Sequence, residues 1–387
     1  MIGDPVYIVG AYEHPTRLAA EQSVAQLHAE VAIGALVDAG LSKDDIDGYF
    51  CASDAPGIGP LSILEYLGLT VRYADSTDIG GSSSVAHVGH AVCAIREGKC
   101  DAALITSAGR PRAEAQAPGD LSELPEYPES AFEVPFRAAL APSYAMCAQR
   151  HMHQYGTTSE QLAWIKVAVS NHAQHNPNAL LPTPVTVEEV LQSPLIADPL
   201  HRLDCCVMTD GGGAVIVARE EVARSINRPM IKVRGAGEAV KYNRGSNIDF
   251  TTSAVAQSAA SAFAEADVTP GDIKYLSTYD SFTITVLLAI EDLGFCEKGE
   301  GGCFVADGNL ISGVGRLPIN TDGGGLCNNH PAHRGGVTKV IETTRQLRGE
   351  AHPSVQVKNC DLAIANGLGG MLDRRHGSAT AILERVS

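Results

Sequence analysis

The sequence predicts an α/β protein composed of two similar halves, the first of which contains a long insertion. Three observations lead to this prediction. Short apolar runs alternate with amphipathic segments along most of the 387 residues. A helix–turn–strand unit that begins at Val24 returns at Val255. Residues 110–200 interrupt the alternation with a composition of their own, and a chain of this length can hold one large domain or two of medium size.

The first half begins with alternating strands and helices. VYIVGAY is a short β-rich run, and the segment after it has apolar residues at helical spacing until Gly40, a residue type that commonly ends helices. AALITSAG is a continuous apolar run, typical of a strand buried on both faces of a parallel sheet. We therefore expect strands at 6–12, 46–53 and 102–109 and helices at about 21–39 and 82–96.

Residues 110–200 form the insertion. RPRAEAQAPGDLSELPEYPESAFEVP is rich in Pro and Glu and predicts an extended segment, with helices after it at about 137–155 and 158–175. Segments this long are usually lids or binding elements, although a plain structural excursion is the alternative. Strands then resume with DGGGAVIVAR at 210–219 and again at 230–240.

The second half repeats the first. A constant offset of 227 aligns two helix–turn–strand units, in each of which an acidic residue precedes the strand. Glycine clusters that feed a helix follow at longer range, GGSSSVAHVGHAV at 80–92 and GGGLCNNHPAHRGG at 323–336. The order predicts two copies of one βαβ-rich half, and chance similarity of alanine-rich helices is the alternative. The matched residues are Ala35, Ala39, Asp45 and Ile46 with Ala262, Ala266, Asp272 and Ile273.

Charge and cysteine usage exclude several classes of protein. With 45 acidic and 29 basic residues the net charge is −16, so binding of nucleic acid over the whole surface is excluded. No run of about 18 apolar residues is present, so we expect no membrane span, and the N-terminus predicts a strand and not a signal peptide. The ten cysteines include no CxxC pair and lie mostly in apolar or glycine-rich segments. We expect free thiols in a reducing cytoplasm and no metal site.

Candidate chemistry lies in glycine turns and in two motifs of the second half. Glycine loops that open helices offer backbone N–H groups to an anion or oxyanion, as at Gly80–Gly81 and Gly323–Gly325, although each could be a close-packing turn. Neither matches a P-loop or a dinucleotide fingerprint. His330 stands in LCNNHPAHRGG, where a loop can hold an imidazole for proton transfer. Tyr279 stands in STYDSFT and can donate to an oxyanion, whereas we expect Asp280 to accept backbone N–H groups.

Together these segments resemble the thiolase superfamily, and within it the sterol-carrier-protein thiolases and the lipid-transfer-protein-like thiolase homologues. The ordered segments that match include GGSSSVAHVGHAVCAIREGKCDAALIT, HRLDCCVMTDGGGAVIV, TYDSFTITVLLAIEDLGFCEKGEGG, LPINTDGGGLCNNHP and ANGLGGML. The resemblance implies a thiolase fold, with two βαβαβαββ halves in a five-layered αβαβα arrangement. It places the halves at 1–230 and 231–387, with a loop domain at about 110–200 over the substrate's pantetheine and acyl chain.

The resemblance also shows what is missing. The nucleophilic cysteine of thiolases maps to Gly81 or Ser82, and their second catalytic cysteine maps to about Gly367. The histidine of the family maps to His330, and Tyr279 stands where thiolases have Asn or His. Cys327 is a possible thiol near the site but matches neither cysteine position. The backbone groups that would hold an oxyanion belong to Gly80, Gly81, Ser82, Gly369 and Gly370.

This pattern resembles the aldolases that cut steroid side chains as CoA thioesters, which lack the nucleophilic cysteine. It implies retro-aldol cleavage of a β-hydroxyacyl-CoA, with Tyr279 and His330 sharing the acid and base roles. Those aldolases have a second tyrosine at the position of His330, so aldolase and thiolase chemistry both stay open. The alternatives are an acetyl-CoA acyltransferase or 3-ketoacyl-CoA thiolase with an unconventional nucleophile, and a non-catalytic subunit that binds lipid or acyl-CoA.

The resemblance implies few other components. No cofactor is expected to be covalently bound, and coenzyme A enters as part of the substrate. A homodimer is expected, because thiolase-fold proteins pair through their core sheets. A separate zinc-ribbon and OB-fold partner protein is also possible, as relatives in this branch use one.

Overall fold

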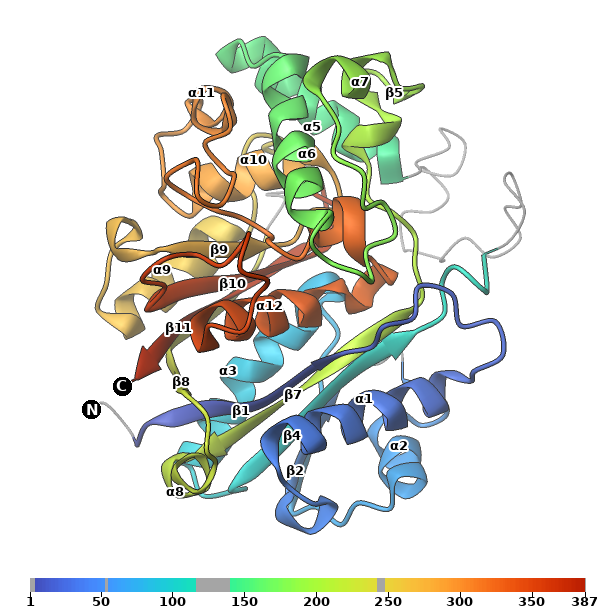
Figure 1. Ribbon diagram of the computed structural model, residues 1–387, viewed down its shortest axis with the longest axis vertical. Helices are drawn as coiled ribbons and strands as arrows, with labels where there is room; N and C mark the ends of the chain where they lie inside the picture. The colour runs from blue at the N-terminus through green and yellow to red at the C-terminus, as the bar shows by residue number, and fades with distance from the viewer. Residues whose placement is uncertain (1–3, 53–54, 116–139, 242–247, 387) are drawn as a thin grey trace.

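Nine strands form one continuous sheet in the computed structural model, which describes residues 4–52, 55–115, 140–241 and 248–386 (Figure 1). The strand order is β3-β2-β4-β7-β1-β8-β11-β10-β9. The strands are β1 (Val6–Glu13), β2 (Gly48–Cys51), β3 (Tyr73–Ser76), β4 (Ala102–Gly109), β7 (Gly211–Arg219), β8 (Met230–Val240), β9 (Tyr275–Thr278), β10 (Leu362–Gly370) and β11 (His376–Val386).

The sheet is symmetric about its centre. From β1 outward the order is β7, β4, β2, β3, and from β8 outward it is β11, β10, β9. The directions agree as well, because β1–β7 and β8–β11 are antiparallel, whereas β2–β4 and β9–β10 are parallel. Two residue pairs, Tyr7 with Lys232 and Ile8 with Ile231, join the halves. The predicted duplication is therefore confirmed, whereas the exact division after residue 230 stays a prediction.

Helices form three further layers around and between the two half-sheets. Helix α1 (Val24–Ala39) packs on β1, β4 and β7, and α9 (Val255–Ala266) packs on β8 and β11. Helices α3 (Ser83–Arg96) and α12 (Gly336–Arg348) contact strands of both halves and each other, so they form the central layer (Figure 1). Each layer boundary has its own apolar core. This arrangement is the five-layered one that the resemblance implied.

Equivalent contacts recur in the two halves at the predicted offset. The Asp45 carboxylate accepts from the Ser42 backbone N–H (2.7 Å) and hydroxyl (2.8 Å). Asp272 accepts from the Thr269 backbone N–H (2.8 Å) and hydroxyl (2.7 Å) in the same way. Each cap fixes a one-turn helix before the second strand of its half. The matched aspartates were therefore conserved features of one turn, copied twice within the chain.

Most predicted elements are present with shifted ends. Helix α1 begins at Val24 and not at Glu21, because the Ser23 side chain accepts from the Gln26 backbone N–H and caps the helix there. Gly40 ends it in the left-handed conformation, as predicted. No helix in the described ranges has the length and apolar character needed to cross a lipid bilayer.

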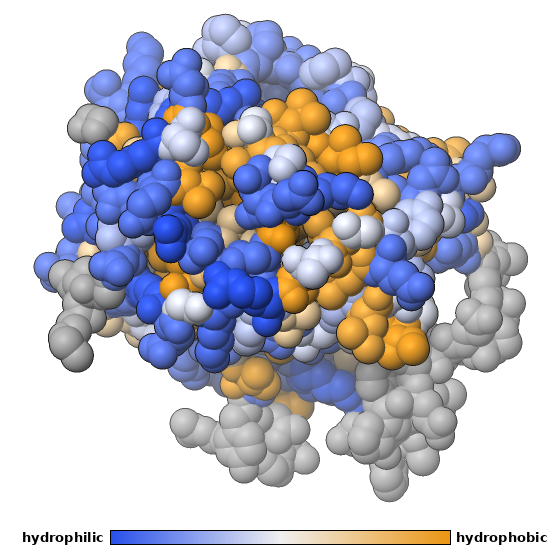
Figure 2. Space-filling view, turned by 90° about the horizontal axis from the view of Figure 1, so that it is seen from below, coloured by the Kyte–Doolittle hydropathy of each residue, from blue (hydrophilic) through white to orange (hydrophobic). Residues whose placement is uncertain are grey.

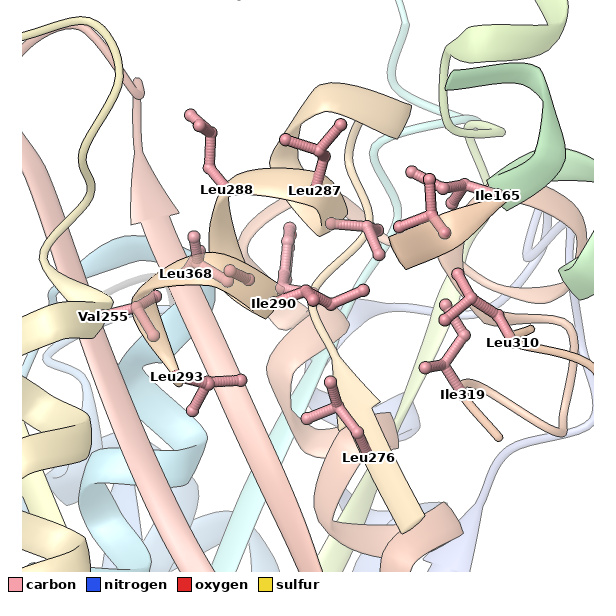
Figure 3. Close-up of a cluster of buried hydrophobic side chains, with 14 of the residues drawn as sticks. Ile165, Val255, Leu276, Leu287, Leu288, Ile290, Leu293, Leu310, Ile319 and Leu368 are labelled. Carbon is pink, nitrogen blue, oxygen red and sulfur yellow. The ribbon is translucent and has the colours of Figure 1, made fainter. Parts of the chain in front are cut away.

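The insertion covers one end of the second half. Its helices contact α10, and Figure 3 shows Ile165 of α6 in the same apolar cluster as Leu287 and Leu288 of α10. Residues 116–139, which hold most of the predicted Pro- and Glu-rich run, lie outside the described residues. The insertion elements are α5 (Leu140–Tyr155), α6 (Ser159–Ala173), α7 (Val187–Gln192), β5 (Leu195–Ala197) and β6 (Leu200–His201), and α10 spans Thr283–Asp292.

The opposite end of the molecule exposes apolar side chains. Figure 2 shows them gathered on the underside, the end at which α1 and α2 (Pro60–Leu67) lie in Figure 1. Ile33 and Val37 of α1 and Leu61 of α2 are all more than half exposed. This surface is far less polar than the net charge of the chain suggests.

Candidate active site

The starts of the two central helices meet at the centre of the molecule. A 3₁₀ turn at Gly80–Ser82 leads into α3, and another at Ala332–Gly335 leads into α12. They approach so closely that a Cβ built on Gly336 would lie 2.0 Å from the Gly81 carbonyl oxygen. The predicted meeting of two helix starts is therefore present, but the prediction that Gly323–Gly325 opens the second helix is wrong. Those glycines instead lead into a π-helical turn at Gly324–Asn328.

The end of β10 packs directly on the start of α3. A Cβ built on Gly80 would lie 2.7 Å from the Gly370 nitrogen and 2.9 Å from the Gly369 Cα. Gly80 also has φ of +63°, a conformation that glycine adopts without strain. The structure thus brings four of the five predicted backbone residues into direct contact or sequence adjacency, with Gly81 between Gly80 and Ser82.

Tyr279 fills the space between the two helix starts. It follows β9, and its backbone N–H donates to the Asn366 carbonyl at 3.0 Å. Its ring lies against Gly81 and Gly335, where added Cβ atoms would be 2.5 Å and 3.1 Å from ring carbons. The phenol donates to the Ala332 carbonyl at 2.7 Å, and burial raises the pKa of Tyr279 well above its ordinary value. The phenol is therefore a neutral hydrogen-bond donor at pH 7.

His330 lies edge-on to the Tyr279 ring. The ring centroids are 5.3 Å apart at an interplanar angle of 71°. The His330 backbone N–H donates to the Thr209 hydroxyl at 2.8 Å, which fixes the loop. Its Nε2 is buried and has no hydrogen-bond partner within the described part of the chain. Burial lowers the pKa of His330 to about 4, so the imidazole is neutral at pH 7 and can accept a proton.

Packed backbone occupies both positions at which thiolases have their cysteines. Any side chain at Gly81 would overlap the Tyr279 ring, and a Cβ at Gly367 would lie 2.8 Å from the Ser82 Cα. The Ser82 hydroxyl is not activated either, because it donates to the Ile79 carbonyl at 2.6 Å and no base accepts from it. The residues that would form a covalent acyl-enzyme in a thiolase are therefore absent here.

Cys327 does not supply a thiolate. It is fully buried within the π-helical turn, and burial raises the pKa of its thiol. Cys206, which the sequence did not single out, lies nearer to Tyr279 because its backbone N–H donates to the Ser281 carbonyl at 2.9 Å. Burial raises the pKa of the Cys206 thiol as well. Both thiols are protonated at neutral pH, which makes them poor nucleophiles.

Two further side chains at the site come from segments that sequence patterns do not connect with it. Tyr144 on α5 stacks on Phe282 with centroids 4.2 Å apart and donates to the Gly370 carbonyl at 3.1 Å. Lys339 on α12 forms a buried ion pair with Asp280 at 3.0 Å. Asp280 also accepts from the Gly325 and Leu326 backbone N–H groups, as predicted for a structural acceptor. No sequence signal pointed to Tyr144, because its segment is an insertion.

The described residues contain no group of three or more His, Cys, Asp or Glu side chains placed to hold a metal ion. His87 is buried in α3, and burial lowers its pKa to about 4. His90 pairs with Glu238 at 3.0 Å on the surface side of that helix. Neither histidine reaches the Tyr279 and His330 side chains, so the functional histidine of this region is His330.

Comparison with known proteins gives a consistent family. Residues 237–385 match the family described as thiolase C-terminal domain-like. The chain is 33% identical over 354 residues to an acetyl-CoA acetyltransferase of Methanothermobacter thermautotrophicus, covering 88% of this chain and 90% of the relative. It is 32% identical over 351 residues to a 17-hydroxy-3-oxo-4-pregnene-20-carboxyl-CoA lyase of Mycobacterium tuberculosis, covering 85% and 87%.

A solved structure described as an Ltp2-ChsH2(DUF35) aldolase superimposes with a TM-score of 0.88. The sequence identity is 29%, and the match covers 99% of this chain and 98% of that one. Similar proteins therefore include both an acyltransferase and C–C lyases. Overall identity does not separate these two chemistries, so the residues at the site must.

Proposed function

The chain belongs to the thiolase superfamily, and from this membership we propose that it cleaves a C–C bond of a β-hydroxyacyl-CoA by retro-aldol chemistry, without a cysteine nucleophile. The observation that supports this most is the pairing of Tyr279 with His330. A buried neutral base with an unpartnered Nε2 lies beside a buried neutral phenol, where a thiolase would need a thiolate. The retro-aldol reaction requires a base and a proton donor and no covalent intermediate.

Each group has a defined task in this reaction. His330 Nε2 accepts the proton of the β-hydroxyl group, and the bond between the α- and β-carbons breaks. The β-carbon becomes a carbonyl, and the electron pair moves into the thioester as an enolate. Backbone N–H groups of the Gly80–Ser82 turn and of Gly369–Gly370 stabilise the enolate oxygen. Tyr279 delivers a proton to the α-carbon and is reprotonated through His330, so no proton is gained or lost.

Thiolase chemistry is the second candidate because the acetyl-CoA acetyltransferase relative is as similar as the lyase. Thiolytic exchange needs a nucleophile that holds the acyl group. Ser82 donates its proton to a backbone carbonyl, and the thiols of Cys206 and Cys327 have raised pKa values. These features favour the lyase. A non-catalytic subunit would bind acyl-CoA without turnover.

Coenzyme A belongs to the substrate in this proposal, and no covalently bound cofactor takes part. The insertion would cover the pantetheine and acyl chain, since Tyr144 of α5 reaches Gly370 at the proposed oxyanion site. A homodimer would form through the edge strand β3, which pairs only with β2 in the nine-stranded sheet. A separate zinc-ribbon and OB-fold partner is proposed because the similar aldolase structure names a second component, ChsH2(DUF35).

The proposal is tested by product analysis. The protein, alone and with its co-purifying partner, is incubated without free CoA with a panel of β-hydroxyacyl-CoA thioesters. The panel includes the 17-hydroxy-3-oxo-4-pregnene-20-carboxyl thioester named for the similar lyase. We expect equal amounts of a ketone or aldehyde and of a shortened acyl-CoA. Binding of every thioester without any product would instead support the non-catalytic subunit.

Tyr279→Phe removes only the phenolic hydroxyl and should lower kcat roughly 10²- to 10⁴-fold, the usual range for a lost proton donor. Tyr66→Phe is the matched control, because Tyr66 is 57% exposed on α2, far from the site. A Tyr279→Phe variant as active as the wild type would remove Tyr279 from the mechanism.

A further inference from the structure

The ion pair between Asp280 and Lys339 is buried directly beneath the site. The Lys339 ammonium lies 3.0 Å from Asp280 Oδ1, and the two side chains are 2% and 0% exposed. Burying two charges costs solvation that their attraction often fails to recover, so such a pair is weak evidence for stability alone. Its position, one residue from Tyr279, suggests a different role.

The Asp280 carboxylate connects the segments that hold the two proposed reacting side chains. It directly follows Tyr279, and it accepts from the Gly325 N–H at 2.7 Å and the Leu326 N–H at 3.1 Å. Those residues start the π-helical turn that leads to His330, and a Cβ on Gly325 would lie 3.1 Å from both Asp280 Oδ1 and His330 Cδ2. One carboxylate therefore fixes the end of β9 relative to the His330 loop.

Lys339 adds the third segment. It lies in the first turn of α12, directly after the Ala332–Gly335 turn whose Ala332 carbonyl accepts the Tyr279 phenol. Two more buried carboxylates, Glu13 and Asp322, act on Lys339 together with Asp280, so the pKa of Lys339 is raised and its ammonium stays charged. The pair thus ties β9, the π-helical turn and α12 together at full charge.

His330 experiences both charges. The carboxylate of Asp280 favours a protonated imidazole, whereas the ammonium of Lys339 disfavours it. The other groups that face His330 are the weakly opposing His333 on its own loop and the neutral Tyr279 ring. Since the two full charges lie side by side and are opposite in sign, their effects on His330 largely cancel, and burial alone decides its state.

We propose that Asp280 and Lys339 are positioning residues, which hold Tyr279 against His330 and balance charge so that His330 stays a neutral base. Only the consequence for turnover rests on the proposed function. The balance itself is a property of the folded chain, and it can be measured without a substrate.

The test is NMR titration of the His330 imidazole in three variants, Lys339→Met, Asp280→Asn and the double variant. Lys339→Met leaves an unpaired carboxylate, so the pKa of His330 should rise by about 1 pH unit or more. Asp280→Asn leaves an unpaired ammonium, so the ring should stay neutral at pH 4, where the wild-type ring is half protonated. The double variant should titrate close to the wild type, because both charges are gone together.

Opposite shifts that cancel in the double variant support the proposal, because loss of packing alone would not change sign between the two single variants. Shifts in the same direction, or none, overturn it. If both single variants fail to fold, the double variant decides. A folded double variant with a wild-type titration supports the charge balance, whereas one that titrates near 6.5, or that does not fold, overturns it.

Activity is measured separately on the same variants. If the protein has a lyase activity, the acidic limb of its pH–rate profile should move upward in Lys339→Met, in step with the NMR titration. If no thioester is cleaved but the titrations shift as expected, the proposed function fails and the charge balance stands. Lys274→Met, on the loop before β9, is the control, and it should leave the His330 titration unchanged.

Discussion

The starts of α3 and α12 face each other at the centre of the molecule, yet they offer different chemistry. At the start of α3 only backbone groups are available, because the Ser82 and Ser83 hydroxyls donate to the Ile79 and Gly80 carbonyls. The start of α12 follows a loop that contains His330 and accepts the Tyr279 phenol. The duplication thus supplies a symmetric scaffold, and the proposed acid–base groups belong to the second half alone.

Removing the base of the second half should have the largest effect. We expect His330→Gln to lower kcat roughly 10²- to 10⁴-fold, because the β-hydroxyl proton loses its acceptor. His333→Gln, three residues away on an exposed side chain, is the control and should stay near the wild-type rate. Equal losses in both variants would show that the loop, and not the imidazole, matters.

Adding one methyl group to the first half should destabilise the site. Gly81→Ala places a Cβ 2.5 Å from the Tyr279 ring, and such overpacking typically costs about 1–3 kcal/mol. Urea unfolding should show a lower midpoint, with reduced turnover. Gly271→Ala is the control, because its Cβ would meet only the Thr269 hydroxyl at 3.6 Å. A Gly81→Ala variant as stable as the control would contradict the observed contact between the halves.

The pH dependence of stability should report the buried His330. Its pKa of about 4 in the folded chain lies below the value near 6.5 of an unfolded histidine. The unfolded chain therefore binds the extra proton, so this stability is present above pH 6.5 and is lost as the pH falls toward 4. At pH 5.5 the contribution is about 1 kcal/mol relative to pH 7.

His330→Gln should accordingly lose less stability than the wild type between pH 7 and pH 5.5, as measured by urea midpoints. Other buried histidines, such as His87 in α3, have similarly lowered pKa values, so part of the wild-type slope should persist. An unchanged slope in the His330→Gln variant would mean that His330 titrates alike in the folded and unfolded chains.

The smallest effect should come from the first-half hydroxyl. Ser82→Ala removes a group that bonds only to the Ile79 carbonyl, so kcat should change by less than about twofold, with at most about 1 kcal/mol lost from stability. A loss of 100-fold or more would identify Ser82 as the nucleophile and restore the acyltransferase reading.

Much of the scaffold was predictable because it depends on local patterns. Gly40, the strand runs and the turns at Asp45 and Asp272 have short-range signals, and the duplication follows from their common offset. Tyr279 and His330 were found through a family resemblance and not through spacing. The structure then placed their rings 5.3 Å apart.

Other parts of the site were not predictable, for physical reasons. Lys339 lies on a helix whose polar residues suggest an exposed face, yet α12 lies between two half-sheets and its Lys339 and Glu342 are buried with partners. The glycines at 323–325 look like a helix start, but the helix begins at Gly336, after a π-helical turn. Long-range pairing, which one sequence does not display, decided both cases.

The central claim is that the chain breaks a C–C bond with side chains of the second half and without a covalent intermediate. The most direct test is intact-mass measurement of the protein during turnover of a β-hydroxyacyl-CoA in the absence of free CoA. We expect ketone or aldehyde and shortened acyl-CoA in equal amounts, with the protein mass unchanged throughout. A protein mass raised by one acyl group, or turnover only of a β-ketoacyl-CoA with free CoA, would contradict the account.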